Sequence, residues 1–405
     1  MQWADVIGQN TVKLQLMEMV QQNRLGHALL FLGKEGNGSL LLALAFAQYL
    51  VCEKNGLTPA ATDNSPSLFG AADTANATPQ PAKDSCGVCP SCIKAGQLIH
   101  PDIHFSYPTV VTKQMKKPIA TEFIKEWRSF ITQNPYGNLF DWISIIKENE
   151  NSQGNITAEE CNDIIRKLSL KSFESPYKIL ILWMPEYLGK SGNKLLKLIE
   201  EPPPDTLIIL VAENEDRILP TILSRCQLIK IPILKPAEIE KALTEREQAN
   251  PATAAQVAAI AEGNYREAVS FLQHAGDNWE EILRNWLNAI LKTGPVAQTH
   301  WVTDISHLGR ENQKQFLHYF IHLLDVALQL RVGDAARLSS HFSATEIDFA
   351  ARLNKMTGIE QQEAMIHEAD RASYYIERNA NSKLLFHALT IKLFHIIRDK
   401  VVFLD

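Results

Sequence analysis

The stretch Gly33-Lys34-Glu35-Gly36-Asn37-Gly38-Ser39-Leu40 decides how the first half of this chain is interpreted. It follows His27–Leu32, a short apolar run typical of a buried strand, and leads into Ser39–Val51, a Leu- and Ala-rich segment typical of a helix. A strand, a glycine-rich turn and a helix are the setting of a phosphate-binding loop, whose pattern is G-x-x-x-x-G-K-[ST]. Gly33 and Gly38 stand at the spacing of that pattern.

The loop departs from the pattern at the two positions that carry its chemistry. Ser39 stands where a lysine should reach the β- and γ-phosphates, and Leu40 stands where a hydroxyl should hold Mg²⁺. We therefore interpret Gly33, Gly36, Gly38 and Ser39 as a degenerate nucleotide cradle and expect no ATP hydrolysis in this chain. The alternative is a glycine-rich turn without nucleotide ancestry.

A second site of the same reaction is altered in the same direction. In a phosphate-loop ATPase, an acidic residue near the end of a neighbouring strand helps to hold Mg²⁺. The predicted strand Lys178–Trp183 instead continues as Met184-Pro185-Glu186, and neither Trp nor Met ligates Mg²⁺. Glu186 is interpreted as a carboxylate at the start of a helix. Two losses in one reaction are stronger evidence than either loss alone.

Four cysteines predict a structural zinc site. Cys86, Cys89 and Cys92 form two consecutive C-x-x-C spacings, which place three thiolates within reach of one ion. Cys52, at the end of the helix after the glycine-rich loop, is the predicted fourth ligand. Four protein ligands would leave no open position for catalysis.

Other interpretations of the cysteines stay open. His100 or His104 would also serve as the fourth ligand, and all the cysteines would also be stable as reduced thiols. An iron–sulfur centre is disfavoured because no further cysteine follows before Cys161. Residues 55–85, between the first two ligands, are rich in small and polar residues, and we expect a flexible insert there.

Arg225 stands in Ser224-Arg225-Cys226, between a predicted short helix and a predicted strand. An arginine at a domain edge can stabilise the charge on a γ-phosphate held by a neighbouring subunit. Taken alone, Arg225 is more simply explained by a surface salt bridge or a helix cap, and Cys226 is most simply a buried thiol.

Strands and helices alternate from residue 27 to residue 232, which predicts a mostly parallel sheet with helices on both faces. Residues 138–155 form a second polar region. After about residue 235 only helical patterns follow. The predicted strands are His27–Leu32, Lys178–Trp183, Thr206–Ala212 and Gln227–Ile231, and the predicted later helices are Ala237–Leu243, Ala254–Ala261, Tyr265–His274, Trp279–Leu291, Glu311–Leu330, Ala344–Met356, Glu360–Arg378 and Ser382–Phe403.

Composition restricts the class of protein. The chain has 405 residues, 45% of them apolar and 21% charged, with a net charge of −6. An acidic balance argues against a stand-alone nucleic-acid binder. The longest wholly apolar run, Leu40–Ala47, is too short to cross a bilayer, and the first residues lack a secretory pattern. We therefore expect a cytoplasmic protein with reduced cysteines and no membrane partner.

Several motifs together resemble the clamp-loader subunits of bacterial DNA polymerase III, in the AAA+ superfamily. They are Gly26–Phe31, the glycine-rich loop, the cysteine cluster, His100-Pro101-Asp102, Asn193–Pro203 and Thr221–Cys226. The resemblance implies a AAA+ α/β domain with a zinc module at 1–234, a small helical lid at 235–275 and an all-α oligomerisation collar at 276–405.

The resemblance also implies roles for single residues. Arg225 matches an arginine that acts in trans on ATP in an adjacent motor subunit, and the four cysteines Cys52, Cys86, Cys89 and Cys92 match the family's zinc ligands. Arg266 matches the second nucleotide sensor of the motor subunits, although a helix-surface arginine is an equal interpretation.

The function implied is that of a non-hydrolysing subunit in the complex that loads a sliding clamp on primed DNA. Its expected partners are motor (gamma/tau) and delta subunits, met through the collar, and the clamp and DNA through the complex. The alternatives are an active ATPase motor of the same complex and a zinc nucleic-acid-binding module.

Overall fold

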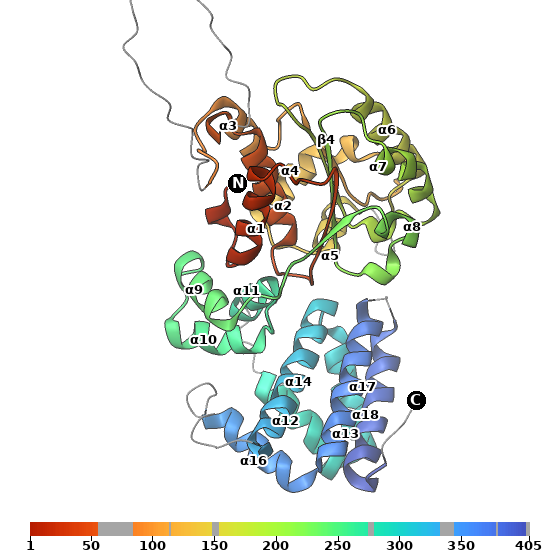
Figure 1. Cartoon of the computed structure of the whole chain (residues 1–405). Helices are drawn as coiled ribbons and strands as arrows, with labels where there is room; N and C mark the ends of the chain where they lie inside the picture. The colour runs from red at the N-terminus through yellow and green to blue at the C-terminus, as the bar shows by residue number, and fades with distance from the viewer. Residues whose placement is uncertain are drawn as a thin grey trace, which may run out of the picture. The chain divides into compact units, whose positions relative to one another are not determined.

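The computed structural model describes residues 1–55, 84–112, 115–147, 154–273, 279–332, 344–377 and 380–401 (Figure 1). They form two compact units, Met1–Glu238 with Gly263–Arg266, and Ile239–Glu262 with Glu267–Asp405. Most of the predicted flexible insert, residues 56–83, lies outside the described residues. Within the described ranges, no helix combines the length and the apolarity that a membrane crossing requires.

The first unit is built on a five-stranded sheet in which every pair of neighbouring strands is parallel. The strand order is β2-β3-β4-β1-β5. Because the strands are parallel, their carboxyl ends meet at one edge, where ligands of open α/β sheets bind. The strands are β1 (Ala28–Leu32), β2 (Ile103–Ser106), β3 (Lys178–Trp183), β4 (Thr206–Ala212) and β5 (Gln227–Lys230).

This sheet confirms the predicted parallel α/β architecture and adds one strand that was not predicted. The edge strand β2 is four residues long, and its His104 breaks the apolar run that marks the other buried strands. Pairing with β3 in the register Ile103↔Ile179 fixes its place in the sheet. A strand this short is defined by its neighbour and not by its own pattern.

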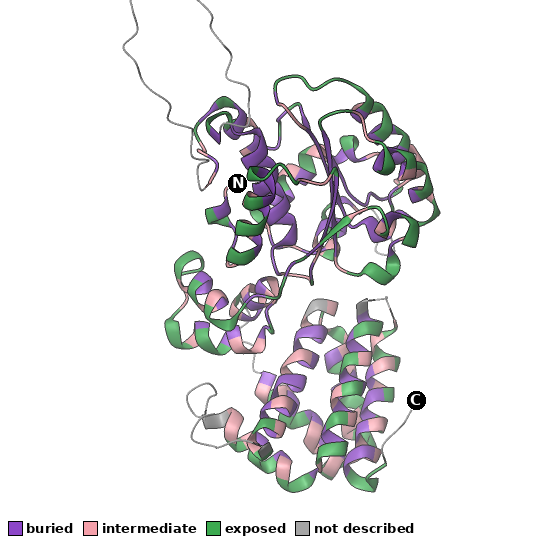
Figure 2. Ribbon diagram, viewed as in Figure 1, coloured by how far each residue is buried: buried purple, intermediate pink, exposed green. Residues whose placement is uncertain are grey.

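Both faces of the sheet are covered by helices. Successive side chains of a strand point to opposite faces. Leu30, Leu180 and Ile208 share one apolar core with residues of α6 and α7, whereas Phe31 on the other face stacks on Phe46 of α2. Every residue of α2 is buried, and Figure 2 shows this helix as a continuous buried segment.

Further helices of the first unit complete these layers. Residues 139–146, inside the region predicted to be polar, form α5, so that prediction is wrong there: Asn138 caps the helix and Trp142 is buried. The helices are α1 (Asn10–Gln21), α2 (Ser39–Val51), α3 (Pro90–Gly96), α4 (Ile124–Gln133), α5 (Leu139–Ile146), α6 (Ala158–Ser169), α7 (Leu196–Glu200) and α8 (Pro220–Leu223), with short 3-10 turns at Trp3–Asp5, Glu53–Asn55, Ala120–Phe123, Pro185–Tyr187, Gly189–Leu195 and Glu215–Arg217.

The second unit is helical throughout its described residues. Its core is centred on aromatic rings: Trp286 stacks on Trp301 at 4.6 Å, and its Nε1 donates to Thr390 Oγ1. Helix α13 was not predicted. The helices are α9 (Pro236–Arg246), α10 (Pro251–Ile260), α11 (Tyr265–Gln273), α12 (Trp279–Asn288), α13 (Pro295–His307), α14 (Arg310–Val332), α16 (Ala344–Met356), α17 (Ile359–Glu377) and α18 (Ser382–Phe394), with π-helical turns at Ala289–Thr293 and His395–Asp399; α9 and α11 each begin in the first unit.

Candidate functional site

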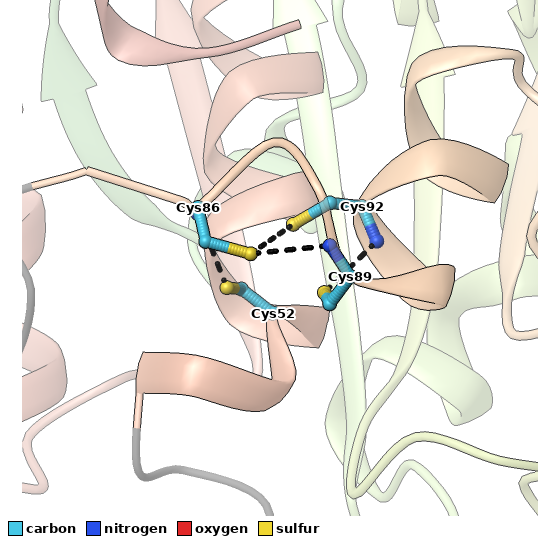
Figure 3. Close-up of side chains that lie close together, drawn as sticks. All are labelled: Cys52, Cys86, Cys89 and Cys92. Atoms are coloured by element: carbon cyan, nitrogen blue, oxygen red, sulfur yellow. Dashed lines mark hydrogen bonds between the residues drawn. The ribbon is translucent and has the colours of Figure 1, made fainter.

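The four cysteines of the predicted zinc site lie together (Figure 3). Cys52 ends α2, Cys89 caps the start of α3, Cys92 lies in its first turn, and Cys86 precedes both. Their sulfur atoms all lie within 4.8 Å of one another. A Zn–S bond of about 2.3 Å gives sulfur atoms about 3.8 Å apart in a tetrahedral site. Cys86 Sγ and Cys92 Sγ are 3.9 Å apart, so the donors fit such an ion.

Backbone N–H groups donate hydrogen bonds to three of these sulfur atoms. The amide of Cys86 donates to Cys52 Sγ, that of Cys89 to Cys86 Sγ, and that of Cys92 to Cys89 Sγ, at 3.3 to 3.4 Å. Burial opposes ionisation of Cys86, but the N–H groups of Val88 and Cys89 outweigh it and lower the pKa of Cys86 to about 7.

The two histidines considered as fourth ligands do not belong to this group. His100 accepts the amide of Asp102 at Nδ1, and its Nε2 lies 3.3 Å from the Glu174 carboxylate. His104 lies in strand β2. Among the described residues, the cysteine cluster is the only group of three or more His, Cys, Asp or Glu side chains close enough to hold one ion.

The N-terminal segment is attached to the cysteine loop, which sequence reasoning missed. The Asp84 carboxylate accepts the amides of Trp3 and Ala4, and Gln2 Nε2 donates to the carbonyl of Ser85. Asp84 thus satisfies N–H groups at the start of a short helix. The same segment continues to Ile7, whose amide donates to the hydroxyl of Tyr136.

The glycine-rich loop connects β1 to α2 as expected. Gly36 and Gly38 have φ angles of 71° and 86°, in the left-handed region that glycine adopts freely. Ser39 Oγ donates to Asn37 Oδ1 at 2.6 Å, and Asn37 Nδ2 donates to the carbonyl of Ile231. Leu40 is buried. The side chains of Asn37 and Ser39 are therefore bound within the chain.

Tyr136 closes the space above this loop. Its hydroxyl accepts the amide of Ile7 at 2.8 Å, and its ring lies 2.8 Å from the position that a Cβ on Gly38 would take. Tyr265 packs edge-on against it, with ring centroids 4.9 Å apart. The cavity left between the loop, Tyr136 and the ends of β3 and β4 has a volume of about 30 Å³. Ligand pockets usually measure about 300 Å³ or more.

Arg266, the predicted sensor position, is bound to carboxylates of its own unit. Its Nε and Nη2 donate to the two oxygens of Asp141 at 2.6 and 2.7 Å, and its Nη1 lies 3.4 Å from Glu35. The side chain is only 11% exposed. Glu35 belongs to the glycine-rich loop and also accepts from Asn138. A carboxylate thus occupies a loop whose usual ligand is an anion.

The backbone of Gly263–Arg266 is attached to the same loop. The amide of Tyr265 donates to the carbonyl of Gly36 at 3.1 Å, and Asn264 lies where a side chain on Gly36 would point. Together with the ion pair between Arg266 and Glu35, these contacts join the segment directly to the glycine-rich loop.

The end of β3 also has a structural use. Trp183 is buried and packs on Trp127 and Phe130, with ring centroids 5.3 and 5.9 Å away. Glu186 does more than start a helix: its Oε1 accepts the amides of Glu213 and Asn214 at 2.6 and 2.8 Å. Burial raises the pKa of Glu186. These residues hold the strand ends in place.

Arg225 follows α8 at the surface, with its side chain 34% exposed. Its Nε and Nη2 donate to Glu200 at the end of α7, and its Nη1 donates to the carbonyl of Thr221 and to Ser224 Oγ. Burial raises the pKa of the neighbouring Cys226 thiol to about 11, consistent with an unreactive thiol.

Sequence reasoning missed Tyr136, Asp141 and Glu200. Glu35 carried a signal, because an acidic residue in a phosphate-binding loop repels phosphate. Asn138 and Asp141 form an N-cap pattern that marks the start of a helix. Nothing in the sequence pairs Asp141 with Arg266, which is 125 positions away.

Comparison with known proteins agrees with the resemblance that the sequence motifs indicated. The family described as "DNA polymerase III, delta subunit" matches residues 8–69 and 67–235. The delta-prime subunit from Bacillus subtilis (strain 168) is 28% identical over 232 residues, 57% of this chain and 50% of that protein. The delta-prime subunit from Escherichia coli (strain K12) is 24% identical over 387 residues, 89% of this chain and 93% of that protein.

A relative with another subunit name also matches. The tau subunit of DNA polymerase III from Escherichia coli (strain K12) is 25% identical over 279 residues, which cover 67% of this chain and 33% of that protein. The chain spans about half of the length of the Bacillus subtilis relative. Together these matches confirm the resemblance to clamp-loader subunits. Since the family match extends over more than half of its length, the chain belongs to the DNA polymerase III delta-subunit family and is a clamp-loader subunit of the AAA+ type.

Proposed function

We propose that this chain is a delta-prime-type subunit that neither binds nor hydrolyses ATP and that assists hydrolysis in a neighbouring subunit of the clamp loader. The loop borders two cavities: one of about 540 Å³ next to Gly33 and Lys34, whose lining includes the acidic Glu213, Glu215 and Asp216, and one of about 30 Å³ beside Gly36, Gly38 and Ser39, which carries the proposal. A space of that size holds about one water molecule, not a nucleotide. The Glu35 carboxylate would also repel phosphates.

Arg225 is the residue that we propose to act in trans. It lies at the surface beside α8, where a neighbouring subunit can reach it. A guanidinium presents a planar set of donors that matches phosphate oxygens and keeps its charge at any physiological pH. Such an arginine stabilises the charge that builds up on the γ-phosphoryl group in the transition state.

We propose that Cys52, Cys86, Cys89 and Cys92 hold a structural zinc ion. All four sulfur atoms are close enough to bind one ion, and N–H groups already point at three of them. When bound, zinc would tie the end of α2 to the start of α3. The four cysteines leave no open coordination position, so no catalytic step is assigned to them.

The remaining assignments extend from the family. We propose an α/β domain at 1–234, a helical lid at 235–275 and a collar at 276–405 through which the chain meets gamma/tau-type and delta subunits. Through that complex it would take part in loading a sliding clamp on primed DNA in the cytoplasm.

The proposal is tested in two steps. The isolated chain is titrated with a fluorescent ATP analogue and Mg²⁺, and we expect no saturable binding. Next, Arg225→Ala is reconstituted with the motor and delta subunits, and turnover at the adjacent site is expected to fall by about 10³-fold. Arg24→Ala, which removes another exposed arginine of the same unit, is the matched control.

Two results would contradict the proposal. Tight, Mg²⁺-dependent binding and turnover by the isolated chain would instead support an ATPase motor. Unchanged turnover in the Arg225→Ala complex would remove the trans-acting arginine.

A further inference from the structure

Every nitrogen of the Arg225 guanidinium has a partner within its own chain. One oxygen of Glu200, Oε1, accepts from both Nε and Nη2. Nη1 donates to the Thr221 carbonyl at 2.8 Å and to Ser224 Oγ at 3.1 Å. A phosphate that approaches Arg225 therefore meets a guanidinium whose donors are already engaged. The Nε and Nη2 donors are bound to a competing anion, the Glu200 carboxylate.

From these contacts we infer that Glu200 holds Arg225 in a parked position, and that the γ-phosphate of a neighbour's ATP must take the guanidinium from Glu200. This inference rests on the trans-acting role proposed above. Glu200 is a positioning residue in this account, because it acts only through Arg225.

The backbones that carry the two side chains are anchored in a buried core. Leu198 and Ile199 of α7 share a buried core with Ile222 of α8. The end of α7 is also tied to the sheet, since His27 Nε2 lies 2.8 Å from the carbonyl of Ile199. Rotation of the Arg225 and Glu200 side chains alone can therefore park and release the guanidinium.

The parked pair is weak enough to be displaced. Arg225 and Glu200 are 34% and 44% exposed, and exposed ion pairs contribute little because water and salt screen them. Hydrogen bonds from a guanidinium to phosphate in a site that excludes water are charge-assisted and much stronger. The phosphate therefore displaces Glu200 once the neighbouring site closes around Arg225. Before that point, Glu200 holds Arg225.

The test compares Glu200→Gln with Glu201→Gln in the reconstituted complex. Both changes remove one negative charge at the end of α7, but Glu201 is exposed and does not contact Arg225. We expect Glu200→Gln to raise basal ATP turnover, without DNA, by about two- to fivefold, the range that the loss of an exposed ion pair allows. Turnover stimulated by clamp and primed DNA should stay unchanged, as should both rates in Glu201→Gln.

A second readout needs no partner subunit. In the isolated chain, nitrogen-15 NMR follows hydrogen exchange at Arg225 Nε–H. We expect faster exchange in Glu200→Gln and wild-type exchange in Glu201→Gln. A role of Glu200 in stability alone would not move this signal selectively, and Glu200→Ala should reproduce the result.

The outcomes separate this inference from the proposed function. If Arg225→Ala leaves turnover unchanged, the trans-acting role fails whatever Glu200 does. If Arg225→Ala lowers turnover but Glu200→Gln has wild-type or reduced basal turnover, the parked position is overturned. An increase caused by Glu200→Gln in the Arg225→Ala background would also overturn it, because the effect would not pass through Arg225.

Discussion

Two regions of the first unit each hold an arginine paired with carboxylates. One is the space around the glycine-rich loop, here called the cleft, which contains Arg266; the other is the turn after α8, here called the Arg225 loop. The two arginines differ in how firmly they are held. Arg266 is 11% exposed and is held by two carboxylates, whereas Arg225 is 34% exposed and pairs with one. A buried arginine that loses its partner leaves an uncompensated charge, but an exposed one is stabilised by water. The difference indicates that the Arg266 pairing is the harder of the two to break and that Arg225 can exchange partners more readily.

Metal removal should have the largest effect of the changes considered, and the effect should be confined to the cysteine cluster and the N-terminal segment. Structural zinc sites contribute on the order of 10 kcal/mol of binding free energy. If the cysteines hold zinc as proposed, chelation should release Cys86 together with Asp84, which holds the N-terminal segment. Hydrogen exchange should then accelerate in residues 1–9 and 84–97 but not in residues 219–226. If exchange in residues 219–226 accelerated as much as in residues 1–9 and 84–97, the Arg225 loop would not be independent of the cysteine cluster.

Asp141→Ala should be the most damaging single change in the cleft. It removes the carboxylate that accepts from both Nε and Nη2 of the nearly buried Arg266, and breaking a buried pair costs about 3–5 kcal/mol. Denaturant unfolding measures the loss, with the exposed Asp216→Ala as control. A loss as small as that of the control would show that the cleft is held as loosely as the Arg225 loop.

Tyr136→Phe tests the lid over the loop with less disturbance. The ring stays, but the amide of Ile7 loses its acceptor, and an unsatisfied buried donor costs about 1–3 kcal/mol. Thermal unfolding would report the change. Because the ring still fills the space above Gly38, no ATP binding should appear, and its appearance would show that the phenol oxygen alone excludes nucleotide.

Glu186→Gln should change how stability depends on pH. Burial raises the pKa of Glu186 in the folded chain above its ordinary value of 4.5. The stabilisation linked to this proton is complete below that value and is lost as pH rises through the folded pKa. The stability of the wild type relative to Glu186→Gln should therefore fall with rising pH. The free energy of unfolding, measured from below pH 4.5 upward with the exposed Glu215→Gln as reference, checks the direction of this change.

Glu200→Ala should have the smallest effect on stability, below about 1 kcal/mol, because its ion pair with Arg225 is exposed. A calorimetric comparison with Asp141→Ala measures the contrast between the two arginines directly. A loss of stability comparable to that of Asp141→Ala would mean that Arg225 is built in as firmly as Arg266, and the contrast drawn here would disappear.

The parts that sequence patterns predicted share a physical basis. Apolar runs such as Thr206–Ala212 match buried parallel strands, and the C-x-x-C spacings brought three thiolates together. Strand β2 and helix α5 escaped prediction because their stability comes from neighbours: β2 pairs with β3, and Trp142 of α5 packs in a cluster of aromatic rings.

The sequence by itself determined that the glycine-rich loop lacks the lysine and the hydroxyl that handle phosphate and Mg²⁺, since side-chain chemistry at a known spacing needs no coordinates. Only the tertiary structure decided what fills the space. Tyr136, Asp141 and Arg266 come from distant segments and meet through packing and charge pairing, which no local pattern encodes. The same holds for Glu200 and Arg225, which are 25 positions apart and meet because α7 and α8 share a core.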